Sequence, residues 1–315
     1  MANFEILYDE PQEAVWFSNL HPHLRDVPLT SITEAATRQS LQAVLAYDRP
    51  DIILLDNGKP ILIVEETLEV PSGHNVGQRF ARLAAAAEAG VPSVYFGPYM
   101  ARKHGGDTEG PRYMNLRLFS AIDNMIRITG SAVTTINWQV DANCEVLKGS
   151  AKDADMREYL SLFLDLYHRN PNQINQSIIN SSLQARLRRE RSAFISAKVR
   201  NSVQYESPPG SVTINSPESL ASQFPLFDTS SIGSKAIVLY NVGMRYIRSD
   251  PYTGMAILYK YLYILQQNRK LVLWFPNISF KSWLSTSNTR KDKRMFIIAS
   301  DAIIFSDQLC LKNHL

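Results

Sequence analysis

Residues 49–67 read RPDIILLDNGKPILIVEET and contain two apolar runs, at 51–55 and 60–64. Between the runs stands Asn57-Gly58, the strongest short sequence signal for a tight β-hairpin turn. Strands this apolar are normally buried on both faces of a sheet. The sequence therefore predicts a buried hairpin at the centre of the first half of the chain.

Three carboxylates gather at the open end of this hairpin, because Asp51 begins its first strand and Glu65 and Glu66 end its second. Buried carboxylates repel one another and lose hydration unless a cation joins them, and Mg²⁺ prefers oxygen ligands. A strict two-residue turn places Asp51 about opposite Val64, with Glu66 on the face of Asp51. A one-residue bulge places Glu65 on that face instead. The sequence is compatible with both registers.

A helix is predicted directly before the hairpin. Ser31-Ile-Thr-Glu34 matches the capping-box pattern, and the apolar spacing that follows predicts a helix to about Tyr47. Pro50 prevents the helix from extending further. Glu34 either completes this capping box or points back towards Asp51.

A second helix is predicted directly after the hairpin. The spacing of residues 77–89 gives one apolar face and a polar face that carries Gln78 and Arg82. A helix stop and a short strand follow within residues 90–98. The order strand, strand, helix, strand makes this helix the crossover between strands of one sheet.

Composition limits the possible classes. With 315 residues, 45% of them hydrophobic, the chain can build a sizeable core in one large or two smaller domains. Its two cysteines, Cys144 and Cys310, give neither a disulfide framework nor a zinc cluster. The sequence has no P-loop, H-E-x-x-H or G-x-S-x-G pattern, no run long enough to span a membrane, and no signal-peptide pattern at its start. We expect a cytoplasmic protein that does not enter the membrane.

Charge is distributed unevenly along the chain. Residues 1–150 hold 12 Lys and Arg against 18 Asp and Glu, a balance of −6, whereas residues 151–315 hold 21 against 12, a balance of +9. We therefore divide the chain into an acidic core that contains the hairpin, 1–150, and a basic part, 151–315. An acidic site beside a basic surface suits a metal-dependent enzyme that binds a polyanion, although an ordinary solvated surface gives the same count.

The most basic predicted helix covers residues 183–203. Its packing stripe leaves the arginines on the remaining surface, where they either contact phosphate groups or are simply solvated. These arginines include Arg186, Arg188, Arg189 and Arg191.

Weaker patterns predict the remaining elements. Residues 1–30 give no clear element, and 101–111 and 206–234 read as loops. The other predictions are an element ending in a helix over 112–128, a strand at 136–140, a helix at 153–167, a strand at 235–240, a turn at 250–254, a helix at 255–266, and strands at 271–275, 295–299 and 303–305.

The order of motifs over residues 31–98 resembles the core of the PD-(D/E)xK nuclease superfamily, in particular its type II restriction-endonuclease-like members. The resemblance rests on the helix with Glu34, Pro50-Asp51, the hairpin that ends in Glu65-Glu66-Thr67, and the helix with Gln78-Arg79 followed by a strand. It covers under a third of the chain.

The resemblance implies a role for each motif residue. Asp51 and Glu65 would hold Mg²⁺ with help from Glu34, and a lysine two residues after the glutamate would orient the attacking water. That position is Thr67 here, or Leu68 if Glu66 is the motif glutamate. Thr67 is the preferred assignment because its hydroxyl can hold a water. Lys59 or Arg79 would then supply the missing charge.

We therefore expect an α/β protein with a mixed central β-sheet flanked by helices and an α+β C-terminal part. The expected activity is Mg²⁺-dependent hydrolysis of phosphodiester bonds in double-stranded DNA, as in a type II restriction endonuclease, by a homodimer whose symmetry matches that of its site. Gln78, Arg79, Arg82 and the basic helix are the expected DNA contacts. The alternative is a nuclease-like subunit of a defence system that has lost catalysis and binds DNA or protein.

Overall fold

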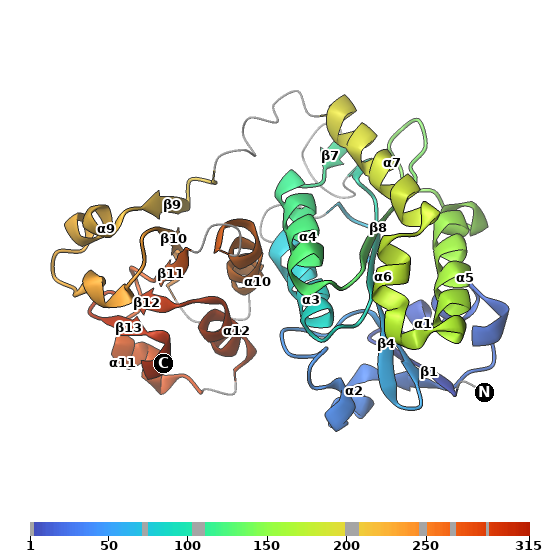
Figure 1. The fold of residues 1–315 in the computed structure, drawn as a ribbon, viewed down its shortest axis with the longest axis horizontal. Coiled ribbons are helices and arrows are strands. Elements are labelled where there is room, and N and C mark those ends of the chain that lie inside the picture. The colour runs from blue at the N-terminus through green and yellow to red at the C-terminus, as the bar shows by residue number, and fades with distance from the viewer. Residues whose placement is uncertain are drawn as a thin grey trace. The chain divides into compact units, whose positions relative to one another are not determined.

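The computed structural model describes residues 3–70, 75–102, 111–198, 208–245, 251–264, 269–287 and 290–315. The protein is mixed α/β and divides into two compact units (Figure 1). The first unit consists of Met1–Gly73, Arg82–Asn115 and Met125–Val199; the second consists of His74–Ala81, Leu116–Asn124 and Arg200–Leu315. Among the described helices, none is long and apolar enough to cross a membrane.

A six-stranded mixed sheet forms the centre of the first unit. Its strand order is β2-β1-β3-β4-β5-β8, and the pairs β1/β3 and β3/β4 are antiparallel whereas the other three pairs are parallel. The parallel pair β4/β5 confirms that the helix between them, α3 (Asn75–Glu88), is a crossover. The strands are β1 (Phe4–Tyr8), β2 (Leu29–Ser31), β3 (Ile52–Asp56), β4 (Lys59–Glu66), β5 (Ser93–Gly97) and β8 (Val133–Asn137).

Helices cover both faces of this sheet because alternate residues of the buried strands point to opposite sides. Ile52 and Leu54 pack into a core with α1, α5, α6 and α7, whereas Ile53 and Leu55 pack with α2 and with Ala86 of α3. The helices α5 to α7 lie together along one side of the sheet in Figure 1. The bounds are α1 Pro11–Ser18, α2 Ile32–Ala35, α5 Ala154–Arg169, α6 Ile174–Ile179 and α7 Ser182–Lys198. Helix α4 (Leu116–Thr129) is divided between the units, with Leu116–Asn124 assigned to the second.

Short elements complete the first unit. Strands β6 (Met100–Arg102) and β7 (Pro111–Tyr113) form a separate antiparallel pair. Most of the loop predicted at 101–111 lies outside the described residues. Single turns of 3₁₀ helix occur at η1 Pro22–Leu24, η2 Gln39–Leu41, η3 Ser150–Asp153 and η4 Pro171–Gln173.

The predicted hairpin is confirmed, and its register contains a bulge. Asn57 and Gly58 both have positive φ, 50° and 72°, as the favoured tight hairpin turn requires. Leu55 pairs with Pro60 but Leu54 pairs with Leu62, so one residue of β4 is left without a partner. The bulge directly follows Pro60, which has no N–H to donate to the ladder.

The predicted helix from Ser31 to Tyr47 is wrong beyond its first turn. The α-helix ends at Ala35, and only the 3₁₀ turn η2 follows it. Gln42 ends the helix by donating its amide to the carbonyls of Ala36 and Arg38, and the Arg38 side chain turns away to pair with Glu5 at 2.7 Å. The Gln42 hydrogen bonds and the ion pair of Arg38 with Glu5 of β1 override the local helical pattern.

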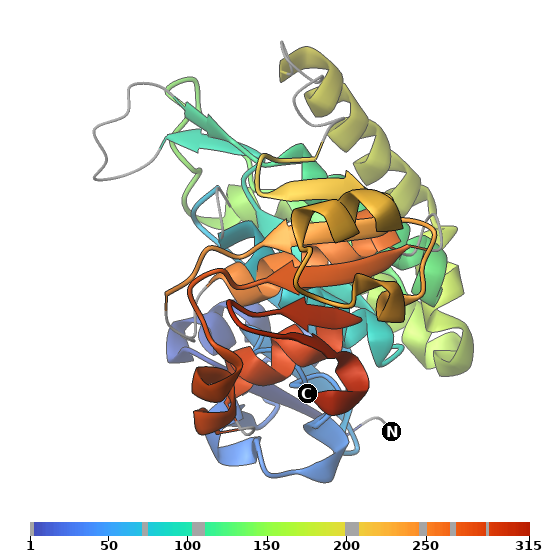
Figure 2. The ribbon, with the colours of Figure 1, turned by 90° about the vertical axis from the view of Figure 1, so that its left-hand side faces the viewer.

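The second unit contains a five-stranded mixed sheet in the order β13-β12-β11-β10-β9, with the three inner strands parallel. Figure 2 shows these strands, coloured gold to red, following one another in this order. Helix α9 packs on one face through Leu220. The elements are β9 Val212–Asn215, α9 Pro217–Gln223, η5 Thr229–Ile232, β10 Ile237–Asn241, α10 Pro251–Tyr259, η6 Lys260–Ile264, β11 Lys270–Trp274, α11 Phe280–Ser285, α12 Lys291–Ala299, β12 Ala302–Ile304, β13 Leu309–Leu311 and η7 Lys312–His314.

Three predictions in the second unit are wrong. The loop at 206–234 contains β9 and α9, the latter begun by Ser216, which accepts a hydrogen bond from the Ser219 N–H. The turn at 250–254 lies largely within α10, and the strand at 295–299 is the end of α12. In α12 the apolar run buries one helical face, and Lys293 donates to the carbonyl of Trp283 at the end of α11. A short apolar run does not by itself distinguish a buried strand from a buried helix.

The division at residue 150 also differs from the structure. Helices α5 to α7 pack on the first sheet, so residues 151–199 belong to the first unit. The apolar stripe of α5, including Leu160 and Phe163, is the physical reason, because it is buried against that sheet. The division predicted at residue 150 rested on net charge, which does not depend on how helices pack.

We expect Gly77→Ala to lower the free energy of unfolding by about 1–3 kcal/mol through overpacking. Gly77 of α3 faces Gly254 of α10 within the second unit, and a Cβ at Gly77 would stand 2.3 Å from the backbone nitrogen of Met255. Urea denaturation measures the change. Gly210→Ala is the matched control, since its Cβ would meet nothing within 4 Å; equal stability losses in the two variants would contradict the packing argument.

Candidate active site

The bulge in the hairpin brings Asp51 and Glu65 together. Ile52 pairs with Val64, so the preceding Asp51 lies beside Glu65 on the adjacent strand and on the same face. Both side chains are buried: Asp51 is 5% exposed and Glu65 0%. The backbone N–H of Glu66 donates to Asp51 Oδ2 at 2.6 Å, which fixes the orientation of that carboxylate. The sequence left the choice of glutamate open, and the register places Glu65 with Asp51.

Arg82 of α3 joins these two carboxylates. Its Nη1 lies 3.0 Å from Asp51 Oδ1 and 2.8 and 3.1 Å from the two oxygens of Glu65. Its Nε is 3.6 Å from Asp48 Oδ2. Burial works against the charge of Arg82, but the charges of Glu65, Asp51 and Asp48 outweigh it and raise the pKa of the guanidinium above its usual range. A positive group therefore occupies the position between the carboxylates.

Glu66 belongs to a different cluster. It extends from the opposite face of β4 and lies 3.6 Å from the Nζ of Lys152 in η3. Lys152 in turn stands over the Trp138 ring, 3.9 Å from its centroid. Burial raises the pKa of the Glu66 carboxyl, and Lys152 partly offsets that rise.

A further carboxylate, Glu13, lies near this edge of the sheet. It is the third residue of α1, and its Oε2 accepts the Glu10 N–H at 3.1 Å in a capping box. The pKa of Glu13 is raised to about 7: burial contributes most to the rise, the Glu10 hydrogen bond opposes it, and the charges of Glu66, Asp9 and Glu65 add to it. Glu13 stands three residues after Glu10, but Glu10 is not one of the Ser, Thr, Asp or Asn residues that begin the capping-box pattern, so the sequence carries only a weak signal for this helix.

Thr67 lies just after Glu66, and its hydroxyl has local backbone partners. The hydroxyl donates to the Glu69 carbonyl at 3.0 Å and accepts the Glu69 N–H at 3.2 Å. The backbone N–H of Thr67 donates to Phe96, and the side chain packs so closely that a Cβ on Gly97 would stand 2.5 Å from its methyl group. In this structure Thr67 shapes the turn after β4.

Glu34 does not join the carboxylate pair. It is exposed on α2, where the Ser31 hydroxyl caps the helix by accepting the Thr33 N–H. Lys59, considered as a substitute lysine, begins β4 at the turn end of the hairpin, opposite the end that carries Glu65. Within the described parts of the chain, no three His, Cys, Asp or Glu side chains are grouped so that they would hold a metal ion.

The predicted basic helix is confirmed as α7 up to Lys198, and residues 199–207 lie outside the described part. Arg186 pairs with Asp155, Glu158 and Glu190 at 2.7–2.8 Å, so its charge is already neutralised. The other expected DNA contacts differ in exposure: Arg191 is buried, Arg79 and Arg188 are half-buried, and Gln78 and Arg189 are exposed.

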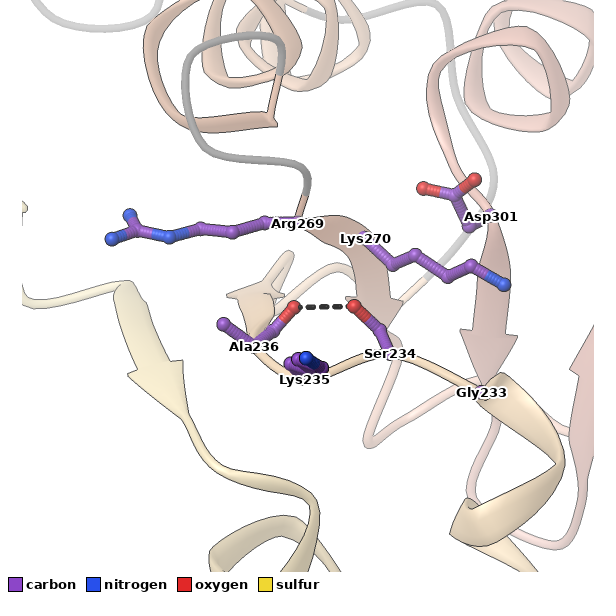
Figure 3. Close-up of a pocket in the computed structure, with 7 residues that line it drawn as sticks. All are labelled: Gly233, Ser234, Lys235, Ala236, Arg269, Lys270 and Asp301. Atoms are coloured by element: carbon purple, nitrogen blue, oxygen red, sulfur yellow. Dashed lines mark hydrogen bonds between the residues drawn. The ribbon is translucent and has the colours of Figure 1, made fainter.

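A cavity of about 460 Å³ lies in the second unit, at the amino ends of β10 and β11, and Figure 3 shows the residues that line it. Lys270 donates to the Ile232 carbonyl at 2.6 Å, and Asp301 accepts the Leu271 N–H at 2.8 Å. Ser234 donates to the Ala236 carbonyl (dashed line in Figure 3). These polar groups bond the backbone next to the amino ends of the strands. Ligands of parallel sheets bind at the opposite, carboxyl ends of the strands, so we do not assign a function to this cavity.

No protein-family model, curated protein or solved structure matches this chain. The geometry of the described residues therefore carries the functional argument.

We expect the stability of the wild-type protein to fall, relative to that of Glu13→Gln, as the pH rises from 4.5 to 8. A carboxyl whose folded pKa is raised from 4.5 to about 7 favours the folded state below its unfolded pKa and loses that contribution as pH rises through the folded pKa. Because the side chain is only half-buried, we expect a difference of about 1 kcal/mol at pH 8.

Urea denaturation at pH 5, 6, 7 and 8 measures this difference. Glutamine keeps an oxygen that accepts the Glu10 N–H, so the cap is preserved. The exposed Glu34→Gln is the control, and it should run parallel to the wild type. A constant difference between wild type and Glu13→Gln at every pH would contradict the prediction.

Proposed function

We propose that the protein is a Mg²⁺-dependent endonuclease that hydrolyses phosphodiester bonds in double-stranded DNA, similar to the type II restriction-endonuclease-like members of the PD-(D/E)xK superfamily. The observation that supports it most is the convergence of Asp51 and Glu65 on one cationic atom at the open end of a buried hairpin. Carboxylates from two adjacent strands, placed by a bulge, are an arrangement suited to a hard cation.

The donor set fits Mg²⁺ in its chemistry. Three oxygens of Asp51 and Glu65 lie within 3.1 Å of Arg82 Nη1, so they already surround one positive position. Mg²⁺ is commonly held by one or two carboxylates together with waters and substrate phosphate, so a third protein ligand is not needed. When bound, the ion would polarise the phosphoryl oxygen and lower the pKa of a water.

The residues around the pair perform the positioning. The Glu66 N–H holds Asp51 in its rotamer, and burial of both acids strengthens every charge interaction at the site. Arg188 and Arg189 of α7 make no ion pair with any described residue, and we propose them as phosphate contacts. A homodimer would place two such sites on the two DNA strands.

A second candidate function has its own support. Arg82 forms ion pairs with both carboxylates, and the Thr67 hydroxyl, in the motif-lysine position, is engaged by Glu69. A nuclease-like core held in that state would bind DNA or a partner protein without cleaving. Incubating the protein with plasmid over a range of Mg²⁺ concentrations distinguishes the two functions, because only the first predicts nicked or linear product.

We expect Glu65→Gln to reduce cleavage by at least about 100-fold, since loss of a metal ligand costs several kcal/mol of transition-state stabilisation. Glu66→Gln is the matched control and should lose less than about tenfold, because Glu66 faces Lys152 on the other side of the sheet. Asp51→Ala should abolish cleavage, and the fold should be retained because Glu65 still pairs with Arg82. Plasmid cleavage over a Mg²⁺ titration measures all three; a larger loss in Glu66→Gln would reverse the assignment.

We expect the double variant Arg188→Ala with Arg189→Ala to weaken binding to all duplex sequences alike. Each lost phosphate contact makes the slope of log K against log salt less negative by about 0.9, so losing both should make it less negative by about 1.8. Fluorescence anisotropy at salt concentrations between about 50 and 200 mM measures this slope. Arg186→Ala is the contrasting variant. Because Arg186 already forms ion pairs within the protein, its loss should lower the stability and leave the salt slope of DNA binding unchanged. An unchanged slope in the double variant would show that this face of α7 does not contact DNA.

A further inference from the structure

We propose that Arg82 is an internal counter-cation of the Asp51–Glu65 pair, and that a divalent cation binds there only by displacing its guanidinium. Arg82 would then occupy the position between Asp51 and Glu65 whenever no divalent cation is bound. This inference rests on the proposed function for its biological meaning, but it concerns an equilibrium of the protein itself.

The contacts show that ion and guanidinium would share one position. Asp51 Oδ1 and both oxygens of Glu65 approach the same nitrogen, Arg82 Nη1, at 2.8–3.1 Å. Oxygens that surround one atom in this way are the oxygens that would surround a metal ion. Two cations cannot occupy that position together, so binding of one requires the other to leave.

The pairing of Arg82 is also incomplete. Arginine binds carboxylates most strongly when two of its N–H groups form parallel hydrogen bonds with one carboxylate. Here both carboxylates use the same Nη1, and the buried Nε makes no hydrogen bond in the described part of the chain. The guanidinium therefore makes its hydrogen bonds to both carboxylates through one nitrogen, without the parallel two-nitrogen geometry that binds a carboxylate most strongly, and this favours exchange.

The surroundings allow Arg82 to remain stable after exchange. Its side chain is 11% exposed, so it borders solvent, whereas Glu65 is fully buried. Asp48 lies 3.6 Å from Nε and keeps a negative charge near the displaced group. The hairpin holds both acids through its backbone pairing, and α3 carries the arginine, so the side chain can move while the acids stay in place.

Isothermal titration calorimetry with Ca²⁺, which takes the same oxygen ligands, tests the exchange without DNA and without catalysis. We expect Arg82→Met to bind Ca²⁺ at least about tenfold more tightly than the wild type, because the competing buried ion pair is absent. Thermal unfolding should show a larger stabilisation of Arg82→Met by Ca²⁺. Arg38→Met is the matched control: it removes an arginine from the ion pair with Glu5 and should keep wild-type Ca²⁺ affinity.

Two further variants keep the test decisive. Arg82→Lys replaces Arg82→Met in the test if the latter does not fold. It retains a positive charge that offsets the buried acids but lacks the planar fork of arginine, so it should fold and bind Ca²⁺ more tightly than the wild type. Adding Asp51→Asn to either variant should remove the gain. Wild-type Ca²⁺ affinity in the folded Arg82 variants would overturn the inference.

The inference and the proposed function fail separately. Tighter Ca²⁺ binding in the Arg82 variants, with no cleavage by the wild type in Mg²⁺, would keep the exchange and reject the nuclease. Cleavage by the wild type, with unchanged Ca²⁺ affinity in the variants, would keep the nuclease and reject the exchange.

Discussion

The ion pairs of Arg82 with Asp51 and Glu65 allow the hairpin to end inside the protein. Two carboxylates on neighbouring buried strands cannot remain charged side by side without a cation, because burial removes the water that would otherwise screen them. Arg82 comes from the crossover helix α3, so the same connection that makes β4 and β5 parallel also delivers the neutralising charge. Fold and site therefore depend on one helix being placed over one end of the sheet.

A single extra residue in β4 determines which glutamate joins that pair. Side chains alternate between the two faces of a strand, so shifting the pairing by one residue moves every later side chain to the other face. The shift after Pro60 puts Glu65 with Asp51 and leaves Glu66 to Lys152. One end of the hairpin thus carries two acidic clusters that are separated by the sheet, each with its own cation.

The sequence predicted the parts of this arrangement that depend on local signals. Asn57-Gly58 identified the hairpin turn and periodicity identified α3, because both follow from residues close together in the chain. The helix expected to reach Tyr47 ended at Ala35 because Arg38 bonds Glu5, 33 residues away. Arg82 was expected to face DNA, since a polar helix face looks the same in sequence whether it meets solvent or a buried carboxylate.

The acidic residues of the site can consequently be predicted from the sequence more easily than the basic residues that pair with them. Asp51 and Glu65 are recognisable because a short motif fixes their strand positions, but Lys152 lies 86 residues beyond Glu66 in the chain and reaches it only through packing of the tertiary structure. Position 67 holds threonine, so the end of β4 carries no positive charge of its own. In this protein it comes from α3 on one face and from η3 on the other, so a motif search limited to the hairpin finds the acids without either cation.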